Sequence, residues 1–327
     1  MDGLQNTASS SSATQPSLSP TAQTPLPSLM IAVVGDVHDL WEAQEETILK
    51  QLGVDLVLFV GDFGNESVDV VRRVAALKIP KAAIMGNHDA WYTATPWGKT
   101  QCPYNRKEED WVQQQLDLLG PAHVGYGRLE LPQFNLTVVG SRPFSWGGSD
   151  WKYKRFYRDR FQVRNFRESV QRMMTEVEAA AHNTLIFLGH CGPQGLGDRP
   201  EDLCGKDWGR ARIGGDYGDP DFMDVIAEAK MMGKSIPLVT FGHMHHHLRH
   251  RTDRERVKAM MHSDKTLYLN GASVPRIKGT GSDRLFHFSL VQLVEGAVTS
   301  ARSVWANPMG DVIHNEVLYS MGNFRVQ

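Results

Sequence analysis

The sequence is poor in cysteine, has no long apolar run and carries almost no net charge. Its 327 residues include three cysteines, Cys102, Cys191 and Cys204. An odd, widely spaced set argues against a disulfide framework and fits a reducing compartment, so we expect a cytoplasmic protein. No apolar run approaches the ~20 residues that cross a bilayer, and no transmembrane segment is expected. The net charge of -2 predicts neither a nucleic-acid polymer as partner nor polybasic attachment to a membrane.

The N-terminal stretch also lacks the features of a secretory signal, since its first basic residue is Lys50 and it has no apolar core. Residues 1–28 are dominated by Ser, Thr, Pro, Gln and Ala, which cannot bury enough apolar surface to offset chain entropy. We predict a disordered tail over 1–28, a dispensable extension being favoured over a docking arm. A single domain over 29–327 follows, and the 41% share of hydrophobic residues is ample for its core.

From Met30 onward, short apolar runs alternate with amphipathic segments. The runs at 30–34, 56–60 and 81–85 predict strands, while 40–52 and 68–77 place apolar residues at helical spacing. Strands joined by crossover helices pair in parallel, and their carboxyl ends meet at one edge of the sheet. Active sites of open α/β sheets lie at that edge.

The rest of the chain predicts a second sheet. The expected elements are a helix at 109–119, a hairpin of 127–131 and 134–139, helices at 164–181 and 219–232, strands at 184–188 and 236–241, and short strands at 267–270, 285–294, 297–304 and near 317–319. We assign the last short strands to the outer part of the second sheet. The predicted fold class is therefore α/β, with two packed sheets flanked by helices.

Five polar motifs each follow a predicted strand. They are Asp36-Val37-His38, Gly61-Asp62, Gly86-Asn87-His88-Asp89, Gly189-His190 and Gly242-His243-Met244-His245. A lone Gly-Asp or Asp-x-His is common by chance, but a motif gains weight when its structural context also appears. A glycine before each candidate ligand permits a tight turn and close packing at the strand end.

In this order the motifs resemble those of the calcineurin-like metallophosphoesterases. The resemblance implies an α/β/β/α sandwich of two mixed β-sheets and a centre of two divalent or trivalent metal ions, manganese first, with iron or zinc as alternatives. One ion would be held by Asp36, His38, Asp62 and His245, and the other by Asp62, Asn87, His190 and His243, so that Asp62 is the bridge. On an extended segment, His243 and His245 point to the same side and Met244 faces away.

The resemblance also implies a phosphoric ester hydrolase, in which a hydroxide that bridges the metals attacks a small phosphorylated substrate in line. His88 is expected beside the metals as a catalytic group, oriented by Asp89 and donating to the phosphoryl oxygen or leaving group. The alternative for His88 is a role in shaping the surroundings of the ligands. Cys191 is expected to be a small packing residue and not a nucleophile.

Departures from the phosphoprotein phosphatases narrow the branch. Those enzymes continue their second motif as Gly-Asp-x-Val-Asp-Arg-Gly and have Gly-Asn-His-Glu, whereas this chain continues from Asp62 as Phe63-Gly64-Asn65-Glu66 and has Asp89. The chain instead resembles bacterial-type enzymes that act on small molecules, among them cyclic-nucleotide phosphodiesterases, nucleotidases and hydrolases of phospholipid precursors or other lipid phosphates. The motifs do not separate these substrates. A non-catalytic binding scaffold is the alternative from another class.

Two insertions, near 142–172 and 191–218, are expected to set specificity. The first interleaves aromatic and basic residues, which favours the inner face of a packed helix over a membrane or nucleotide platform. The second is glycine-rich and is expected either to close over a phosphate-bearing substrate or to form a flexible excursion. Arg142, Arg199 and Arg212 are the candidate substrate-binding residues, with plain surface arginines as the alternative. The oligomeric state stays open.

Overall fold

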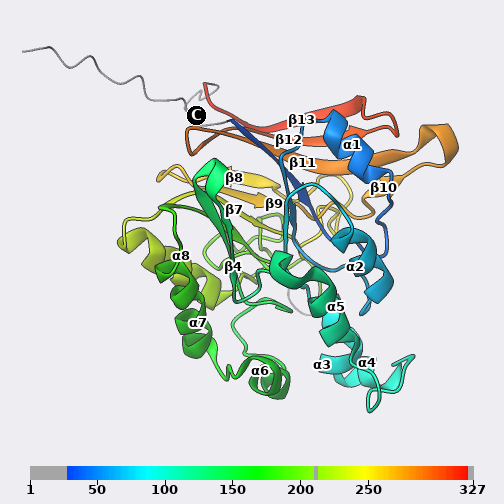
Figure 1. Ribbon diagram of the computed structural model, residues 1–327, viewed down its shortest axis with the longest axis vertical. Coiled ribbons are helices and arrows are strands. Elements are labelled where there is room, and N and C mark those ends of the chain that lie inside the picture. Colours follow the sequence, from blue (N-terminus) through cyan, green and yellow to red (C-terminus); the bar gives the residue numbers. More distant parts are fainter. Residues whose placement is uncertain (1–27, 210–212, 323–327) are drawn as a thin grey trace, which may run out of the picture.

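The computed structural model describes residues 28–209 and 213–322, which form two β-sheets with helices on both outer sides (Figure 1). One side carries α1 (Glu45–Gln51), α2 (Val68–Ala75) and α5 (Trp111–Leu119), and the other carries α7 (Phe166–Glu178) and α8 (Pro220–Met231). The predicted α/β class, with two mixed sheets flanked by helices, is confirmed. Residues 1–27, which hold nearly all of the predicted tail, lie outside the described residues.

The first sheet runs in the order β13-β12-β11-β1-β2-β3, and β10 also pairs with β11. Its strands are β1 (Leu29–Val34), β2 (Leu56–Phe59), β3 (Lys81–Ala83), β10 (Ile277–Lys278), β11 (Leu285–Val294), β12 (Ala297–Ala306) and β13 (Val312–Ser320). The strands β1, β2 and β3 are parallel neighbours, because α1 and α2 return the chain to the same edge. Their carboxyl ends therefore meet on one side, as predicted.

The second sheet runs in the order β4-β5-β6-β7-β9-β8. Its strands are β4 (Arg128–Leu131), β5 (Leu136–Gly140), β6 (Thr184–Leu188), β7 (Ser235–Phe241), β8 (Ala259–Met261) and β9 (Leu267–Asn270). The predicted hairpin is β4 and β5, and the pairs β5–β6, β6–β7 and β7–β9 are parallel. The carboxyl ends of β6 and β7 are thus neighbours.

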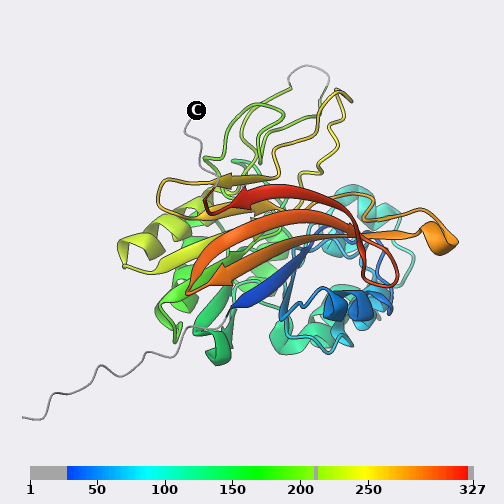
Figure 2. The same cartoon turned by 90° about the horizontal axis from the view of Figure 1, so that it is seen from above.

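The prediction that the strands near 285–294, 297–304 and 317–319 belong to the second sheet is wrong. Strand β11 pairs antiparallel with β1, and β12 and β13 follow it in the first sheet (Figure 2). Periodicity identifies a strand but not its partner. The burial of β11 is that of an interior strand, with Val291 in the core between the sheets and Phe288 in the core under the helices.

The two sheets are held together by alternate residues of their strands. Ile31 and Val33 of β1 lie in one cluster with Ile186 and Leu188 of β6, between the sheets. Ala32 lies in a different cluster with the helices, because successive side chains of a strand point to opposite faces. A third cluster packs β6 against α7 and α8. This packing brings the carboxyl ends of strands from both sheets to one region.

The aromatic segment 151–172 contains α6 (Lys154–Phe161) and the start of α7, which corresponds to the helix predicted at 164–181. Gln162 ends α6 with a left-handed φ of 59°. Tyr157 is buried, and the rings of Trp151 and Phe166 pack edge to face at 5.1 Å. The aromatic side chains therefore pack inward, as the favoured interpretation predicted. Within the described ranges, none of the helices combines the length and hydropathy needed to cross a membrane.

Arg142 is part of this packing and does not reach solvent. Its side chain is 3% exposed, its Nη2 donates to Asp219 Oδ1 at 2.6 Å, and its Nε donates to Asp221 Oδ2 at 2.9 Å. The rings of Trp151 and Phe166 lie 4.9 and 5.4 Å from its guanidinium carbon. The structure does not support the predicted contact of Arg142 with substrate phosphate, because two buried carboxylates and two rings occupy the guanidinium.

Replacing Arg142 by Met should leave two carboxylates buried without their cation. We expect the free energy of unfolding, measured in urea, to fall by ~3–5 kcal/mol. Arg155→Met is the matched control, since this side chain is 88% exposed and pairs with Asp159 at the surface. Its loss should stay below ~1 kcal/mol. Equally small losses in both variants would contradict the structural role of Arg142.

Candidate metal centre

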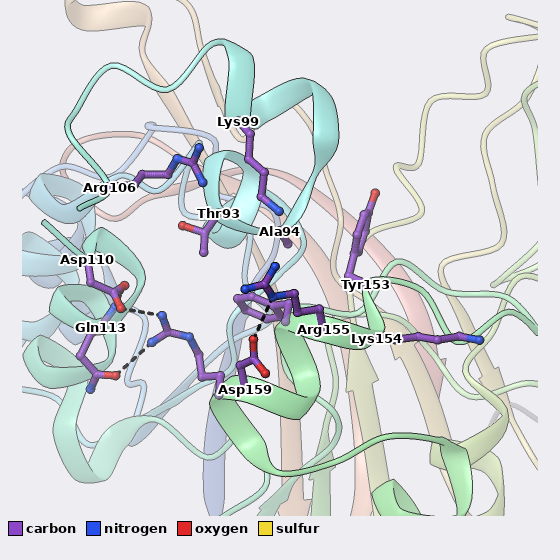
Figure 3. A pocket seen from close by; sticks show the side chains of 12 residues that line it. Thr93, Ala94, Lys99, Arg106, Asp110, Gln113, Tyr153, Lys154, Arg155 and Asp159 are labelled. Atoms are coloured by element: carbon purple, nitrogen blue, oxygen red, sulfur yellow. Dashed lines mark hydrogen bonds and ion pairs between the residues drawn. The ribbon is translucent and has the colours of Figure 1, made fainter. Parts of the chain in front are cut away.

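One large cavity of the molecule is not the metal site. It has a volume of about 920 Å³ and opens between α3 (Trp91–Ala94), α4 (Pro96–Thr100) and α6 (Figure 3). Its carboxylates Asp110 and Asp159 pair with Arg160 at 2.7 Å and Arg155 at 3.2 Å. None of the predicted metal ligands lines it. Four of the predicted ligands, Asp62, Asn87, His243 and His245, instead line a second, smaller cavity.

A first set of ligand atoms comes from the turns after β1 and β7. Asp36, His38 and His245 each offer one ligand atom, and these atoms lie within 4.8 Å of one another. His245 Nε2 is 3.1 Å from Asp36 Oδ2 and 3.4 Å from His38 Nε2. These three residues are three of the four that were predicted to hold one ion, the fourth being Asp62.

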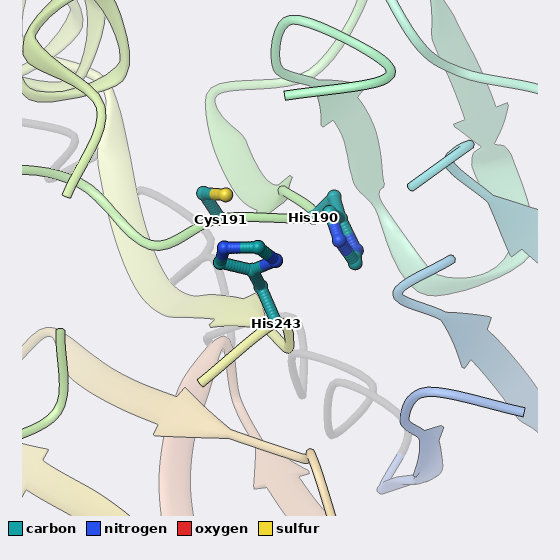
Figure 4. A group of neighbouring side chains, drawn as sticks. All are labelled: His190, Cys191 and His243. Atoms are coloured by element: carbon teal, nitrogen blue, oxygen red, sulfur yellow. The ribbon is translucent and has the colours of Figure 1, made fainter. Parts of the chain in front are cut away.

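A second set comes from the turns after β3, β6 and β7. His190 and His243 point toward each other with Cys191 beside them, as Figure 4 shows, and their rings are 5.1 Å apart. His190 Nε2 lies 3.0 Å from Asn87 Oδ1. Its Nδ1 lies 2.7 Å from the carbonyl oxygen of Val60, which leaves Nε2 as the nitrogen free for a metal.

Asp62, at the end of β2, lies between the two sets. Its Oδ1 is 3.3 Å from His190 Nε2, and its Oδ2 is 4.0 Å from His38 Nε2. One carboxylate oxygen thus faces each set, which is the arrangement expected of a bridging ligand. All seven predicted metal ligands converge at one place in the fold.

Four of these ligand residues adopt a backbone conformation that side chains rarely adopt. Asp36, His38, Asp62 and His243 have φ values of 37°, 43°, 52° and 66°. Such strain collects at functional sites, where the surrounding structure enforces it. The positive φ of His243 corrects the prediction of an extended segment at this position. The predicted assignment of His243 and His245 to different ions agrees with the two sets. Met244 between them is buried.

Two glycines make room for the ligands. A Cβ on Gly86 would lie 2.2 Å from Asp62 Oδ1 and 2.6 Å from His190 Cε1. A Cβ on Gly242 would lie 2.3 Å from Asp36 Oδ1. Any side chain at either position would therefore occupy the space of a ligand atom, which explains why these motifs begin with glycine.

The electrostatics of the residues fit a pair of cations. Burial, helped by the nearby His190, lowers the pKa of His243 to about 3, so its imidazole is neutral and able to bind a metal at neutral pH. Burial raises the pKa of Asp36, but the hydrogen bond and charge of His245 outweigh it and hold the pKa well below its usual range. Carboxylate, amide and imidazole donors suit manganese, iron or zinc.

His88 lies beside the ligands, but Asp89 does not orient it. His88 Nδ1 is 2.6 Å from Asn65 Oδ1. The buried Asp89 instead accepts hydrogen bonds from the backbone N–H groups of Phe63 at 2.8 Å and Gly86 at 2.7 Å. Burial, followed by the charge of Asp62, raises the pKa of Asp89 well above its usual value. Asp89 thus holds the turns that carry the predicted ligands Asp62 and Asn87. The contact with the His88 imidazole that was predicted for Asp89 is made by Asn65.

The smaller cavity, of about 430 Å³, opens directly above the ligands and contains residues that sequence reasoning missed. Besides His88 and several predicted ligands, its lining includes Trp91, Trp146, Lys152, Asp207, Trp208, Tyr217 and Arg249. The sequence could have indicated these residues by their position, because they lie in or near a motif or a predicted insertion. Arg199 is exposed and does not line this cavity. Arg212 lies outside the described residues.

The thiol of Cys191 is adjacent to the second set but is committed to packing. Its Sγ lies 3.5 Å from the carbonyl oxygen of Ser145, and the residue is buried. Burial raises the pKa of this thiol well above its usual value, so the nucleophilic thiolate is disfavoured. The geometry agrees with the expectation of a small packing residue.

Comparisons with known proteins identify the family. Residues 29–247 match the family model of calcineurin-like phosphoesterases, and the chain therefore belongs to this family. No curated protein gives a match. The chain is similar to the solved structure of TT1561 of Thermus thermophilus, with 12% identity, a TM-score of 0.46 and coverage of 81% of this chain and 94% of that one.

Two further solved structures show similarities of the same order. A dimetal phosphatase from Danio rerio has 11% identity and a TM-score of 0.44, with coverage of 91% of this chain and 100% of that one. GAP50, the anchor in the inner membrane complex of Plasmodium, has 11% identity and a TM-score of 0.43, with coverage of 90% and 89%.

The shared carboxylate predicts a metal stoichiometry. We expect the wild-type protein to retain about two Mn²⁺ ions per chain after dialysis and Asp62→Ala to retain at most about one, because both ions lose a ligand. Elemental analysis measures this directly. Asp69→Ala removes an exposed carboxylate from α2 and is the matched control. Full occupancy in Asp62→Ala would contradict the bridging position.

Proposed function

We propose that this chain is a metal-dependent phosphoric ester hydrolase that acts on a small phosphorylated substrate, with Asp36, His38, Asp62, Asn87, His190, His243 and His245 as ligands of two ions. The single observation that carries the proposal is the convergence of these residues into two sets with Asp62 between them. We propose manganese as the first candidate metal, with iron and zinc as alternatives. Two bound cations would supply an acidified water and neutralise charge on the phosphoryl oxygens.

The protein's own residues would orient the ester and manage a proton. The backbone N–H of His88 donates to Asp62 Oδ1 at 2.9 Å, which places the imidazole at the edge of the metal centre. With Asn65 Oδ1 as acceptor, His88 Nδ1 carries a proton and Nε2 is left to face the cavity. A protonated His88 would thus donate through Nε2 to the phosphoryl oxygen or the leaving group.

Further proposals concern the class of substrate and the location of the protein. A cyclic-nucleotide or lipid-phosphate phosphodiesterase is the second candidate, since two metal ions would promote the hydrolysis of a monoester or of a diester by the same chemistry. A cytoplasmic location is proposed because the three cysteines are free thiols, as a reducing compartment would keep them. A non-catalytic scaffold is disfavoured, because every predicted ligand lies in the centre.

The proposal predicts hydrolysis by the purified, Mn²⁺-loaded protein. It should cleave p-nitrophenyl phosphate or bis(p-nitrophenyl) phosphate, and His243→Ala should lower kcat at least ~100-fold, since even loss of a partner behind a ligand costs ~10–100-fold. His262→Ala, at the surface, is the matched control and should retain full activity. Unchanged turnover in His243→Ala would refute the proposed site.

The contact between Asn65 and His88 predicts a change in the pH profile. His88→Ala should lower kcat by ~10²–10⁴-fold, the usual contribution of a general acid. Asn65→Ala removes an acceptor that favours the protonated imidazole, so the pKa of His88 should fall. Activity that needs the protonated form would then decline at a lower pH than in the wild type. Asn183→Ala, at the surface, should leave the profile unchanged, and an unshifted profile in Asn65→Ala would argue against this role.

A further inference from the structure

The cavity above the metal ligands is bounded by aromatic rings that pack into none of the hydrophobic cores of the described residues. They are Trp91, Trp146, Trp208 and Tyr217. All four are only half-buried. A large ring that is rigidly held but left out of the core presents apolar surface to whatever enters the cavity.

One wall is a column of rings that starts at the metal centre. Trp91 stacks on His88, with ring centroids 5.0 Å apart and planes inclined by 8°. Trp146 stacks on Trp91 in turn, at 5.5 Å and 28°. Tyr153 closes the column with an edge contact to Trp146 at 5.4 Å. Trp91 and Trp146 both line the cavity, and Trp146 is the one farther along the column from His88.

A second group of rings comes from the described part of the glycine-rich insertion, where backbone hydrogen bonds hold Tyr217. The backbone N–H of Tyr217 donates to the Cys204 carbonyl at 2.9 Å, and that of Gly148 donates to the Tyr217 carbonyl at 2.8 Å. The second bond joins the two predicted insertions. Trp208 makes an edge contact with Tyr217 at 5.0 Å. Trp146 and Trp208 are thus held on segments that a backbone hydrogen bond connects.

Positive charge accompanies these rings. Lys152 and Lys206 each place Nζ 5.3 Å from the centre of the Tyr217 ring. Arg249 lines the cavity, and its guanidinium pairs with no carboxylate of the described residues. The cavity therefore offers flat apolar surface and cations together, at the side of the metal ligands.

We propose that the substrate is a phosphoester whose organic group contains a flat aromatic ring, and that this ring lies between Trp146 and Trp208. The inference rests on the proposed function, because it places the phosphoryl group at the metal ligands. Arg249 and Lys152 would face further negative charge on the same molecule. The cavity volume of about 430 Å³ lies within the range of small-molecule sites, ~300–1,000 Å³. A nucleotide has this combination of ring and charge, whereas a sugar phosphate has the charge alone.

The test compares two ligands that share the same phosphate ester but differ in the ring. Adenosine 5′-monophosphate and ribose 5-phosphate are titrated as inhibitors of aryl-ester hydrolysis by the Mn²⁺-loaded full-length protein. The nucleotide should bind at least ~10-fold more tightly, which corresponds to ~1.4 kcal/mol and lies within the range of base stacking on an aromatic side chain. Trp208→Ala should remove about that ~10-fold for the nucleotide and leave ribose 5-phosphate unchanged.

Two variants separate stacking from general damage. Trp208→Phe keeps a ring and should keep most of the preference, while Trp97→Ala removes a tryptophan that is 66% exposed on α4 and should change neither inhibition constant. Equal inhibition by the two ligands in the wild type, or an equal loss for both in Trp208→Ala, would overturn the proposal. If no ester is hydrolysed, the proposed function fails, but calorimetric dissociation constants for the same ligands and variants still decide whether the ring is bound.

Discussion

The burial of two carboxylates beside four imidazoles is the constraint on which the rest of this structure depends. Asp36 and Asp62 are almost completely buried, and no described lysine or arginine pairs with either. A buried charge without a counter-ion is costly, and so is a cluster of imidazoles with facing nitrogens. A pair of bound cations would satisfy both groups at once. The positive φ values of four ligand residues are the local backbone strain that accompanies this arrangement, and the glycines at the strand ends leave room for the ligand atoms.

The predicted metal ligands come together only because the two sheets pack against each other with the carboxyl ends of their strands in one region. Asp36, Asp62 and Asn87 follow strands of the first sheet, while His190 and His243 follow strands of the second. Contacts across the join are direct, as in the bond of His190 to the carbonyl of Val60. The apolar cluster between the sheets is therefore part of the site, since it sets the distance between the ligands.

Both insertions contribute residues to the lining of the cavity beside the metal ligands, and each is tied to another segment by hydrogen bonds. The first begins with Arg142, whose buried contacts with Asp219 and Asp221 tie the loop after β5 to the start of α8. The second carries Trp208 and Tyr217 to the cavity and is fastened to the first by the hydrogen bond from Gly148 to Tyr217. Loops placed on a rigid scaffold are where related enzymes differ in substrate. The sequence predicted that Arg142, Arg199 and Arg212 bind substrate phosphate. In our proposal, aromatic rings together with Lys152 and Arg249 bind the substrate instead.

The sequence by itself determined the strand and helix pattern of the first half, the α/β class and the seven candidate ligands. These follow from local information, because apolar periodicity marks each strand and the residues just after it are at the site. Only the tertiary structure decided which sheet β11 to β13 join, that Arg142 is buried, and that Asn65 rather than Asp89 contacts His88. Each of these depends on a contact between separate segments of the chain, and the local sequence pattern does not indicate which segments come into contact. Long-range packing selects among several partners of similar chemistry, and a linear pattern carries no signal for that choice.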